Sequence, residues 1–175
     1  LSTIQLNSPT RGFSYNTDSL LDMRFDKNQK IKASHILNNL DIHELSKVLY
    51  KYSEDRRSRL IANKIIKLRP LSKVSDLVEA IRRSTPPKNR IKTLSRVFQA
   101  IRIKVNEEII KLEKFLSSFI QRLQLGGRIV IISFHSIEDR LVKHNFKKKS
   151  KGGDLLIHTK KPLIASKDEI QKNKR

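Results

Sequence analysis

The feature that most limits the possible folds of this 175-residue chain is an apolar run between a pair of glycines and a polar cluster. Gly126 and Gly127 end a helical pattern, and residues 129–132 are four consecutive β-branched residues. Such a run after a turn is typical of a strand buried on both faces, as in a parallel sheet. Ligands of open α/β sheets lie beyond the carboxyl ends of strands, so residues 133–140 are expected to face a site. A core strand with an ordinary helix cap is the alternative.

The residues after this strand predict a helix and then less regular structure. Ser136 and Asp139 have the spacing of a capping box, which predicts that a helix begins directly after Ser136. The lysines and glycines of residues 147–153 indicate a flexible basic linker. Residues 155–159 are expected to form a short strand.

Residues 31–125 carry the spacing of amphipathic helices, and four helices are expected there. Asp41 and Glu44 form a capping box before the first helix. The last helix is expected to run for about 28 residues, or to break within residues 114–118, where serine is a weak helix former. The apolar stripes are Ile42, Leu45, Val48, Leu49 and Tyr52; Leu60, Ile61, Ile65 and Leu68; Val74, Leu77, Val78 and Ile81; and Phe98, Ile101, Val105, Ile109, Leu112, Leu116, Phe119 and Leu123.

A formal net charge of +21 favours a polyanionic partner, with nucleic acid ahead of a membrane surface. Lysine-rich composition from an AT-rich genome is the alternative explanation. The helical region has basic outer faces with few acidic neighbours, which suits the tracking of phosphates; solvated surface charge is the alternative. The basic residues are Arg56, Arg57, Arg59, Lys64, Lys67, Arg69, Arg82, Arg83, Lys88, Arg90, Lys92 and Arg96.

Composition also excludes several classes of protein and site. The absence of cysteine excludes disulfides and thiolate metal sites, and it fits a reducing, cytoplasmic location. No apolar run approaches the roughly 20 residues that span a bilayer, so no membrane contact is expected. His135, Glu138 and Asp139 are possible ligands, but neighbouring helical residues point about 100° apart and nothing nearby completes a site. We therefore expect no metal.

The first thirty residues have turn formers and no helical period. Arginine and aspartate alternate there with aromatic residues, between Arg11 and Asp26. This mixture suits a loop that meets a ligand and stacks a base. A surface loop held by its own arginine–aspartate pairs is the alternative.

Several segments, in this order along the chain, resemble those of the MraW family, also called ribosomal RNA small subunit methyltransferase H. Residues 11–15 and 21–26 are similar to its R-G-F-S-F and L-D-M-R-M-D block. The further similar segments are residues 96–103 and 105–108 (R-T-F-Q-A-L-R-I-x-V-N-x-E-L), 126–142 (G-G-R-L-x-V-I-S-F-H-S-L-E-D-R-I-V), and 159–162 with 166–170 (T-K-K-P-I and S-E-E-E-I). At the family's His-Pro this chain has Lys92-Thr93.

The resemblance implies transfer of a methyl group from S-adenosylmethionine to the exocyclic N4 of a cytidine in 16S rRNA of the small ribosomal subunit. It implies a mostly α chain with a partial α/β unit: a helical insertion lobe beside the remnant of a Rossmann-like methyltransferase domain. Residues 1–30 would be a loop of that domain, residues 31–125 the helical substrate-recognition lobe, and residues 126–175 the truncated C-terminal part of the domain.

The resemblance also assigns site residues. His135 is expected to accept a proton or orient the base, with Asp22 second; Asp22 pinning Arg24 is the alternative. Among donor-binding positions only Gln5 falls within the chain, where it matches the Gln of the family's S-S-P-Q-L turn, with Ile4 in place of the proline. The RNA-contacting candidates are Arg11, Phe13, Tyr15, Arg24 and Arg140, with the aromatic rings stacking the target base.

The family's glycine-rich donor loop has no counterpart in these 175 residues. We therefore expect that the chain corresponds to the C-terminal part of the enzyme, that most of the donor pocket lies in an N-terminal half, and that the chain alone is inactive. Two alternatives stay open. One is a non-catalytic basic RNA-binding module, and the other is a decayed, inactive gene fragment.

Overall fold

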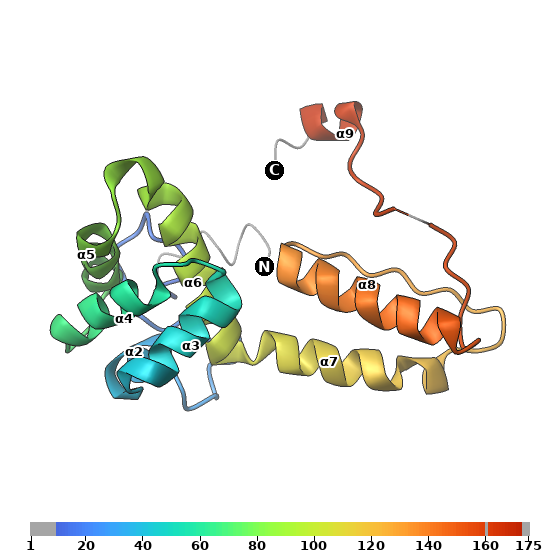
Figure 1. Ribbon diagram of the computed structural model, residues 1–175, viewed down its shortest axis with the longest axis horizontal. Helices are drawn as coiled ribbons and strands as arrows, with labels where there is room; N and C mark the ends of the chain where they lie inside the picture. The colour runs from blue at the N-terminus through green and yellow to red at the C-terminus, as the bar shows by residue number, and fades with distance from the viewer. Residues whose placement is uncertain (1–9, 160, 173–175) are drawn as a thin grey trace. The chain divides into compact units, whose positions relative to one another are not determined.

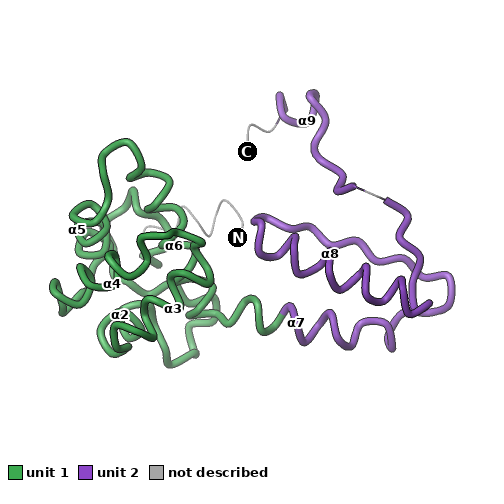
Figure 2. Tube along the Cα trace, in the orientation of Figure 1, with its two compact units in different colours: residues 1–111 green, residues 112–175 purple. Residues whose placement is uncertain are grey.

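The computed structural model describes residues 10–159 and 161–172, and helices dominate it. The prediction of a mostly α chain is confirmed. Within the described residues there is no strand, and the one β-bridge joins Leu20 and Lys73. The chain divides into two compact units, the first ending at Lys111 and the second beginning at Leu112 (Figure 2). None of the described helices is long and apolar enough to cross a membrane.

The first unit is a cluster of helices around α6 (Figure 1). The residues of the four predicted stripes, the last of which continues into the second unit, are largely buried, as amphipathic spacing requires, although Leu60 is exposed. Helix α6 packs against α2, α3 and α5, and α3 also packs against α4. The elements are α2 (Ala33–Asn39), α3 (Ile42–Ser53), α4 (Ser58–Lys67), α5 (Val74–Ser84), the 3-10 turn η1 (Pro87–Asn89), α6 (Arg90–Asn106) and the beginning of α7 (Glu108–Ser118).

The capping box before α3 is confirmed: the backbone N–H groups of His43 and Glu44 donate to Asp41 Oδ1 at 2.7 and 2.8 Å. The single long final helix is wrong. Glu107 adopts the left-handed conformation, with φ of 54°, and it separates α6 from α7. A left-handed residue interrupts the α-helical hydrogen-bond ladder. The apolar spacing continues across this residue, so the periodicity of the sequence did not indicate the break. Helix α7 then ends at Ser118, inside the window predicted for a break.

The second unit contains the end of α7, the 3-10 turn η2 (Phe119–Arg122), α8 (Ser136–Lys151) and α9 (Lys167–Lys172). Its apolar core is small and consists of Leu116, Phe119 and Val142 with partly buried neighbours. The Phe119 ring lies 5.9 Å from that of Phe146 on α8. This packing joins α8 to the region that precedes it in the chain.

The buried strand predicted for residues 129–132 is wrong. The segment has no strand partner among the described residues, and its side chains alternate in exposure. Ile129 and Ile131 pack against the core of the second unit, whereas Val130 and Ile132 are 86% and 76% exposed. One apolar face is therefore covered by helices and the other is open. The short strand predicted at residues 155–159 is likewise absent.

The boundaries of α8 differ from the prediction at both ends. His135 is the N-cap, with its Nδ1 accepting the Glu138 N–H at 3.3 Å, and Glu138 Oε2 accepts the Phe134 N–H at 2.9 Å. The cap is therefore formed by the His135 imidazole, one position before the predicted Ser136, and Glu138 binds the backbone of Phe134 rather than that of the N-cap residue. The predicted linker at residues 147–153 is also wrong, because α8 continues to Lys151. Lysine favours helix well enough to extend it until the two glycines.

A buried polar network joins α6 to the turn before α4. The Asp55 carboxylate accepts hydrogen bonds from Arg57 Nε at 3.1 Å, Arg57 Nη2 at 3.0 Å and Thr93 Oγ1 at 3.2 Å. Thr93, which stands where the family has proline, is buried here. Burial by itself raises the pKa of Asp55, but the hydrogen bonds and charge of Arg57, with the Thr93 hydroxyl, outweigh it and hold the pKa below its ordinary value.

Asp55→Asn is expected to lower the free energy of unfolding at pH 7 by about 2 kcal/mol, because Arg57 loses a charged acceptor. A carboxylate with a lowered folded-state pKa stabilises the fold above its ordinary pKa, and this contribution is lost as the pH falls through the folded-state value. The gap between wild type and variant should therefore shrink below about pH 4. Urea unfolding of both proteins from pH 7 to pH 3 measures this difference in unfolding free energy. A difference that does not change with pH would contradict a stabilising role of the ionised Asp55.

Candidate functional site

The loop of residues 11–29 in the first unit carries most of the predicted site residues, and backbone contacts fix its path. Gly12 has φ of 68°, and a Cβ atom there would lie 2.5 Å from the carbonyl oxygen of Leu20. Only glycine fits this position without displacing backbone. The carbonyl oxygens of Leu21 and Asp22 accept the N–H groups of Ser34 and Ala33 at 2.9 and 2.7 Å, which satisfies donors at the start of α2.

Asp22 and Arg24 form a two-pronged ion pair within this loop. Arg24 Nε lies 2.6 Å from Asp22 Oδ1, and Arg24 Nη2 lies 2.9 Å from Asp22 Oδ2. The side-chain hydrogen bond from Arg24 is the main cause that lowers the pKa of Asp22. Arg24 Nη1 also donates to the carbonyl oxygens of Lys27 and Gln29. With both oxygens occupied and a lowered pKa, Asp22 is a weak proton acceptor, and the geometry favours the pinning of Arg24.

Arg11 and Phe13 are likewise engaged in the loop. Arg11 Nη2 donates to the carbonyl oxygens of Arg24 and of Phe25, the latter at 2.9 Å. Its guanidinium lies 5.6 Å from the centre of the Phe13 ring, which is itself buried against Phe25. These contacts give both residues a role in holding the loop. Stacking of a base on Phe13 and phosphate binding by Arg11 stay predictions.

Asn106 is a functional candidate that sequence reasoning did not single out. Its buried amide lies at the end of α6, where Oδ1 accepts the Phe25 N–H at 2.7 Å and Nδ2 donates to the Met23 carbonyl at 2.7 Å. Met23 itself is left-handed, with φ of 58°. The amide thus holds the backbone on both sides of Arg24. One feature of the sequence indicated this residue, the family-like segment 105–108. The pattern of that segment does not show that it contacts residues about 80 positions earlier in the chain.

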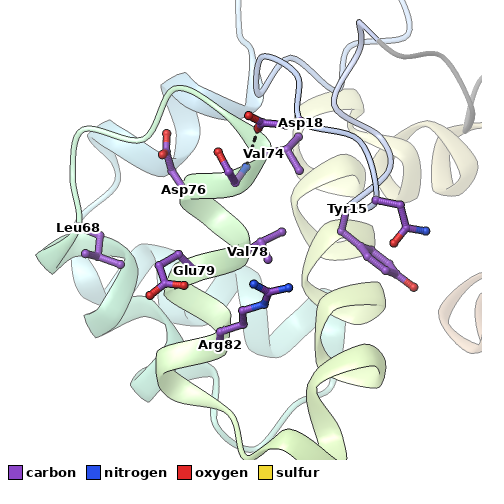
Figure 3. Close-up of a pocket in the computed structure, with 10 residues that line it drawn as sticks. Tyr15, Asp18, Leu68, Val74, Asp76, Val78, Glu79 and Arg82 are labelled. Atoms are coloured by element: carbon purple, nitrogen blue, oxygen red, sulfur yellow. Dashed lines mark hydrogen bonds between the residues drawn. The ribbon is translucent and has the colours of Figure 1, made fainter.

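Tyr15 lies on a pocket of about 550 Å³ between the loop and α5 (Figure 3). Its ring meets Phe98 edge-on at 5.7 Å. Asp18 Oδ1 accepts the Ser75 N–H at 3.1 Å at the start of α5, and this backbone hydrogen bond is the main cause that lowers the pKa of Asp18. The pocket offers carboxylate acceptors, a guanidinium and an aromatic ring to a ligand. The charged groups that line it are Asp18, Asp76, Glu79 and Arg82.

His135 belongs to the second unit, and its side chain is 8% exposed. Its Nδ1 accepts the Glu138 N–H, and its Nε2 lies 3.4 Å from Glu138 Oε1. A neutral imidazole that accepts at Nδ1 carries its proton on Nε2. Arg140 lies one turn further along α8 and is exposed. Gln5, the predicted donor-binding residue, lies outside the described residues.

Apart from the half-buried Lys64 and Arg96, the structure divides the predicted basic residues of the helical region into two groups. Arg57 joins the Asp55 network, Arg69 donates to the Leu37 and Leu40 carbonyls, and Arg90 donates to the Thr85 carbonyl at 3.2 Å. These three side chains therefore stabilise the fold. The remaining exposed group consists of Arg56, Arg59, Lys67, Arg82, Arg83, Lys88 and Lys92, of which Arg83 pairs with Glu79.

Comparison with known proteins gives a match to the MraW methylase family over residues 1–175. The chain is 46% identical over 178 residues to the ribosomal RNA small subunit methyltransferase H of Nostoc sp. (strain PCC 7120 / SAG 25.82 / UTEX 2576), covering 100% of this chain and 58% of that protein. The protein of the same name from Thermosipho africanus (strain TCF52B) is 44% identical over 179 residues, with 100% and 60% coverage. The chain belongs to the MraW methylase family, and it spans somewhat more than half the length of these relatives.

Asn106→Ala is expected to lower the free energy of unfolding by about 2–3 kcal/mol, because it removes the hydrogen bonds of a buried amide to Met23, Phe25 and Arg102 and leaves loop backbone groups unpaired. Trypsin should then cleave faster after Arg24 and Lys27, since the backbone on both sides of Arg24 loses its hydrogen bonds to α6. The matched control is Asn39→Ala, whose amide donates only within its own helix, to the His35 carbonyl at 2.9 Å. Equal cleavage rates in the two variants would contradict the role of Asn106 as the anchor.

Proposed function

We propose that this member of the MraW methylase family is part of an S-adenosylmethionine-dependent enzyme that methylates the exocyclic N4 of a cytidine in 16S rRNA. The observation that carries the proposal is the family match along all 175 residues, together with relatives named for methylation of small-subunit ribosomal RNA. The residues that resemble the family also contact one another: the amide of Asn106 binds the backbone of residues 23–25.

The share of this chain in the reaction is proposed to be RNA recognition and part of the catalytic domain. The exposed group defined above, Arg56, Arg59, Lys67, Arg82, Arg83, Lys88 and Lys92, would hold RNA phosphates, and within this group the structure shows an acidic partner for Arg83. The substrate would be 16S rRNA in the small ribosomal subunit, in the cytoplasm. The helical lobe of residues 31–125 supplies this surface, and residues 126–175 supply the domain remnant that carries His135.

The chemistry assigned to His135 is orientation of the base. The N4 lone pair of cytidine is delocalised into the ring, so the enzyme must align it with the methyl group. Because Nδ1 accepts the helix N–H, the neutral imidazole would present an Nε2–H donor, which suits orientation better than acceptance of a proton. The hydrogen bond from the Glu138 N–H to Nδ1 holds the ring, and Arg140 would bind phosphate nearby on the same helix.

S-adenosylmethionine supplies the methyl group when it is bound. Gln5 is the one residue of this chain that the resemblance assigns to the donor, and it lies outside the described residues. The described residues therefore contain none that we assign to holding the donor, and most of the donor pocket is proposed to lie in the part of the relatives that this chain does not span.

A non-catalytic RNA-binding module is the second candidate, and the charge of the chain favours it. It differs from the first in requiring no methyl donor. A decayed, inactive fragment is the third, and it predicts neither RNA binding nor methyl transfer.

Calorimetric titration of the purified chain with S-adenosylmethionine tests whether most of the donor pocket lies outside this chain. We expect no heat of binding up to about 1 mM donor, because a chain that lacks most of the pocket should bind the donor with a dissociation constant weaker than this. Such a constant corresponds to a binding free energy of less than about 4 kcal/mol. Supplying the N-terminal part of a relative should restore transfer of labelled methyl groups to small-subunit RNA. Micromolar binding by the chain alone would contradict the placement, and absence of transfer in the reconstituted mixture would favour the second or third candidate.

RNA affinity measured against salt tests the basic surface of the first unit. Arg59→Gln combined with Lys67→Gln is expected to reduce the slope of log affinity against log salt by about 1.5, since each phosphate contact contributes about 0.7–0.9. The control pair Lys111→Gln and Lys114→Gln removes the same charge from exposed positions outside this surface. An equal change in both pairs would show that net charge alone, without a defined surface, governs the affinity.

A further inference from the structure

Helix α8 has a continuous basic face. Five exposed residues of this helix lie along one side of it, because they are spaced by one and three residues in turn. They stand at positions 143, 144, 147, 148 and 151. We call this set the α8 stripe, and it consists of Lys143, His144, Lys147, Lys148 and Lys151. At a rise of about 1.5 Å per residue the stripe is about 12 Å long.

The opposite face of α8 is occupied by packing. Val142 is buried in the core of the second unit, and Leu141 and Phe146 pack against that core. Lys149, the helical lysine outside the stripe, places its ammonium 5.7 Å from the centre of the Phe119 ring. The helix is therefore anchored through one face, and the stripe is turned to solvent.

Helix stability does not account for the whole stripe. Cations in the last turn interact favourably with the helix dipole, which explains Lys148 and Lys151. The same argument does not apply to Lys143 and Lys147, which lie before that turn. The acidic residues of α8 are in its first turn, where Asp139 is four residues before Lys143, so the other positions of the stripe have no carboxylate of this helix beside them.

We infer that the α8 stripe is a second RNA-binding surface, in which lysine ammonium groups contact the phosphates of an RNA strand. The inference rests on the proposed RNA substrate and adds a surface outside the helical lobe. Basic amphipathic helices also bind anionic membranes, but they do so by inserting an apolar face. The apolar face of α8 packs against its own unit, so the chemistry left to a partner is electrostatic, as in binding to a phosphate backbone.

The test is a triple variant, Lys143→Gln, Lys147→Gln and Lys151→Gln, in the full 175-residue chain. Glutamine has nearly the same helix propensity as lysine, so circular dichroism should show an unchanged helix content. RNA affinity is measured between 50 and 200 mM salt with a fragment of 16S rRNA. The slope of log affinity against log salt should fall by about 2, and affinity at low salt by about tenfold or more.

The matched control removes three charges from exposed lysines outside both basic surfaces: Lys104→Gln, Lys111→Gln and Lys114→Gln. Wild-type affinity in the stripe variant, or an equal loss in the control, would overturn the α8 surface while leaving the proposed function intact. Absence of RNA binding by the wild-type chain would overturn both. Vesicles of phosphatidylserine and phosphatidylcholine are titrated in parallel, and a variant that loses vesicle binding but keeps RNA binding would assign the stripe to membranes and overturn the inference.

Discussion

The amide of Asn106 is the buried polar contact that ties the loop of residues 11–29 to the end of the central helix of the first unit. It binds the backbone on both sides of Arg24, in a loop that also contacts α6 through Gln29, whose amide donates to the Val105 carbonyl, and through Tyr15, whose ring meets Phe98. It also stands directly before Glu107, where the left-handed backbone ends α6. One buried side chain therefore joins the end of the central helix to the loop that carries Asp22 and Arg24.

The helices of the first unit could be predicted because the information for them is local. Apolar spacing and the Asp41–Glu44 capping box act within a few residues, and α3 to α5 follow them closely. The buried strand failed for the opposite reason. A β-branched run becomes a strand only when another strand supplies its hydrogen bonds, and residues 129–132 have no such partner among the described residues. The cap of α8 moved by one residue because an imidazole nitrogen replaced the expected hydroxyl.

The candidate site was predicted in part. The alternative of a loop held by its own arginine–aspartate pairs, raised from the alternation of charges, agrees with the bidentate contact of Asp22 and Arg24. The anchoring role of Asn106 could not be foreseen, because its partners lie some 80 positions away in the sequence. Charge counting had a similar limit: it treated Arg57, Arg69 and Arg90 as surface cations, although their guanidinium groups bind acceptors of the fold.

The half-covered apolar segment of residues 129–134 has a consequence for how the purified protein behaves. The apolar side chains of Val130, Ile132 and Phe134 are exposed, and this open face can pack against the same face of another molecule. At low ionic strength the charge of +21 keeps molecules apart, and added salt screens this repulsion over roughly 10 Å at 0.1 M. Salt should therefore promote self-association of the chain while it weakens binding to RNA, so the two kinds of complex would form at opposite ends of a salt titration.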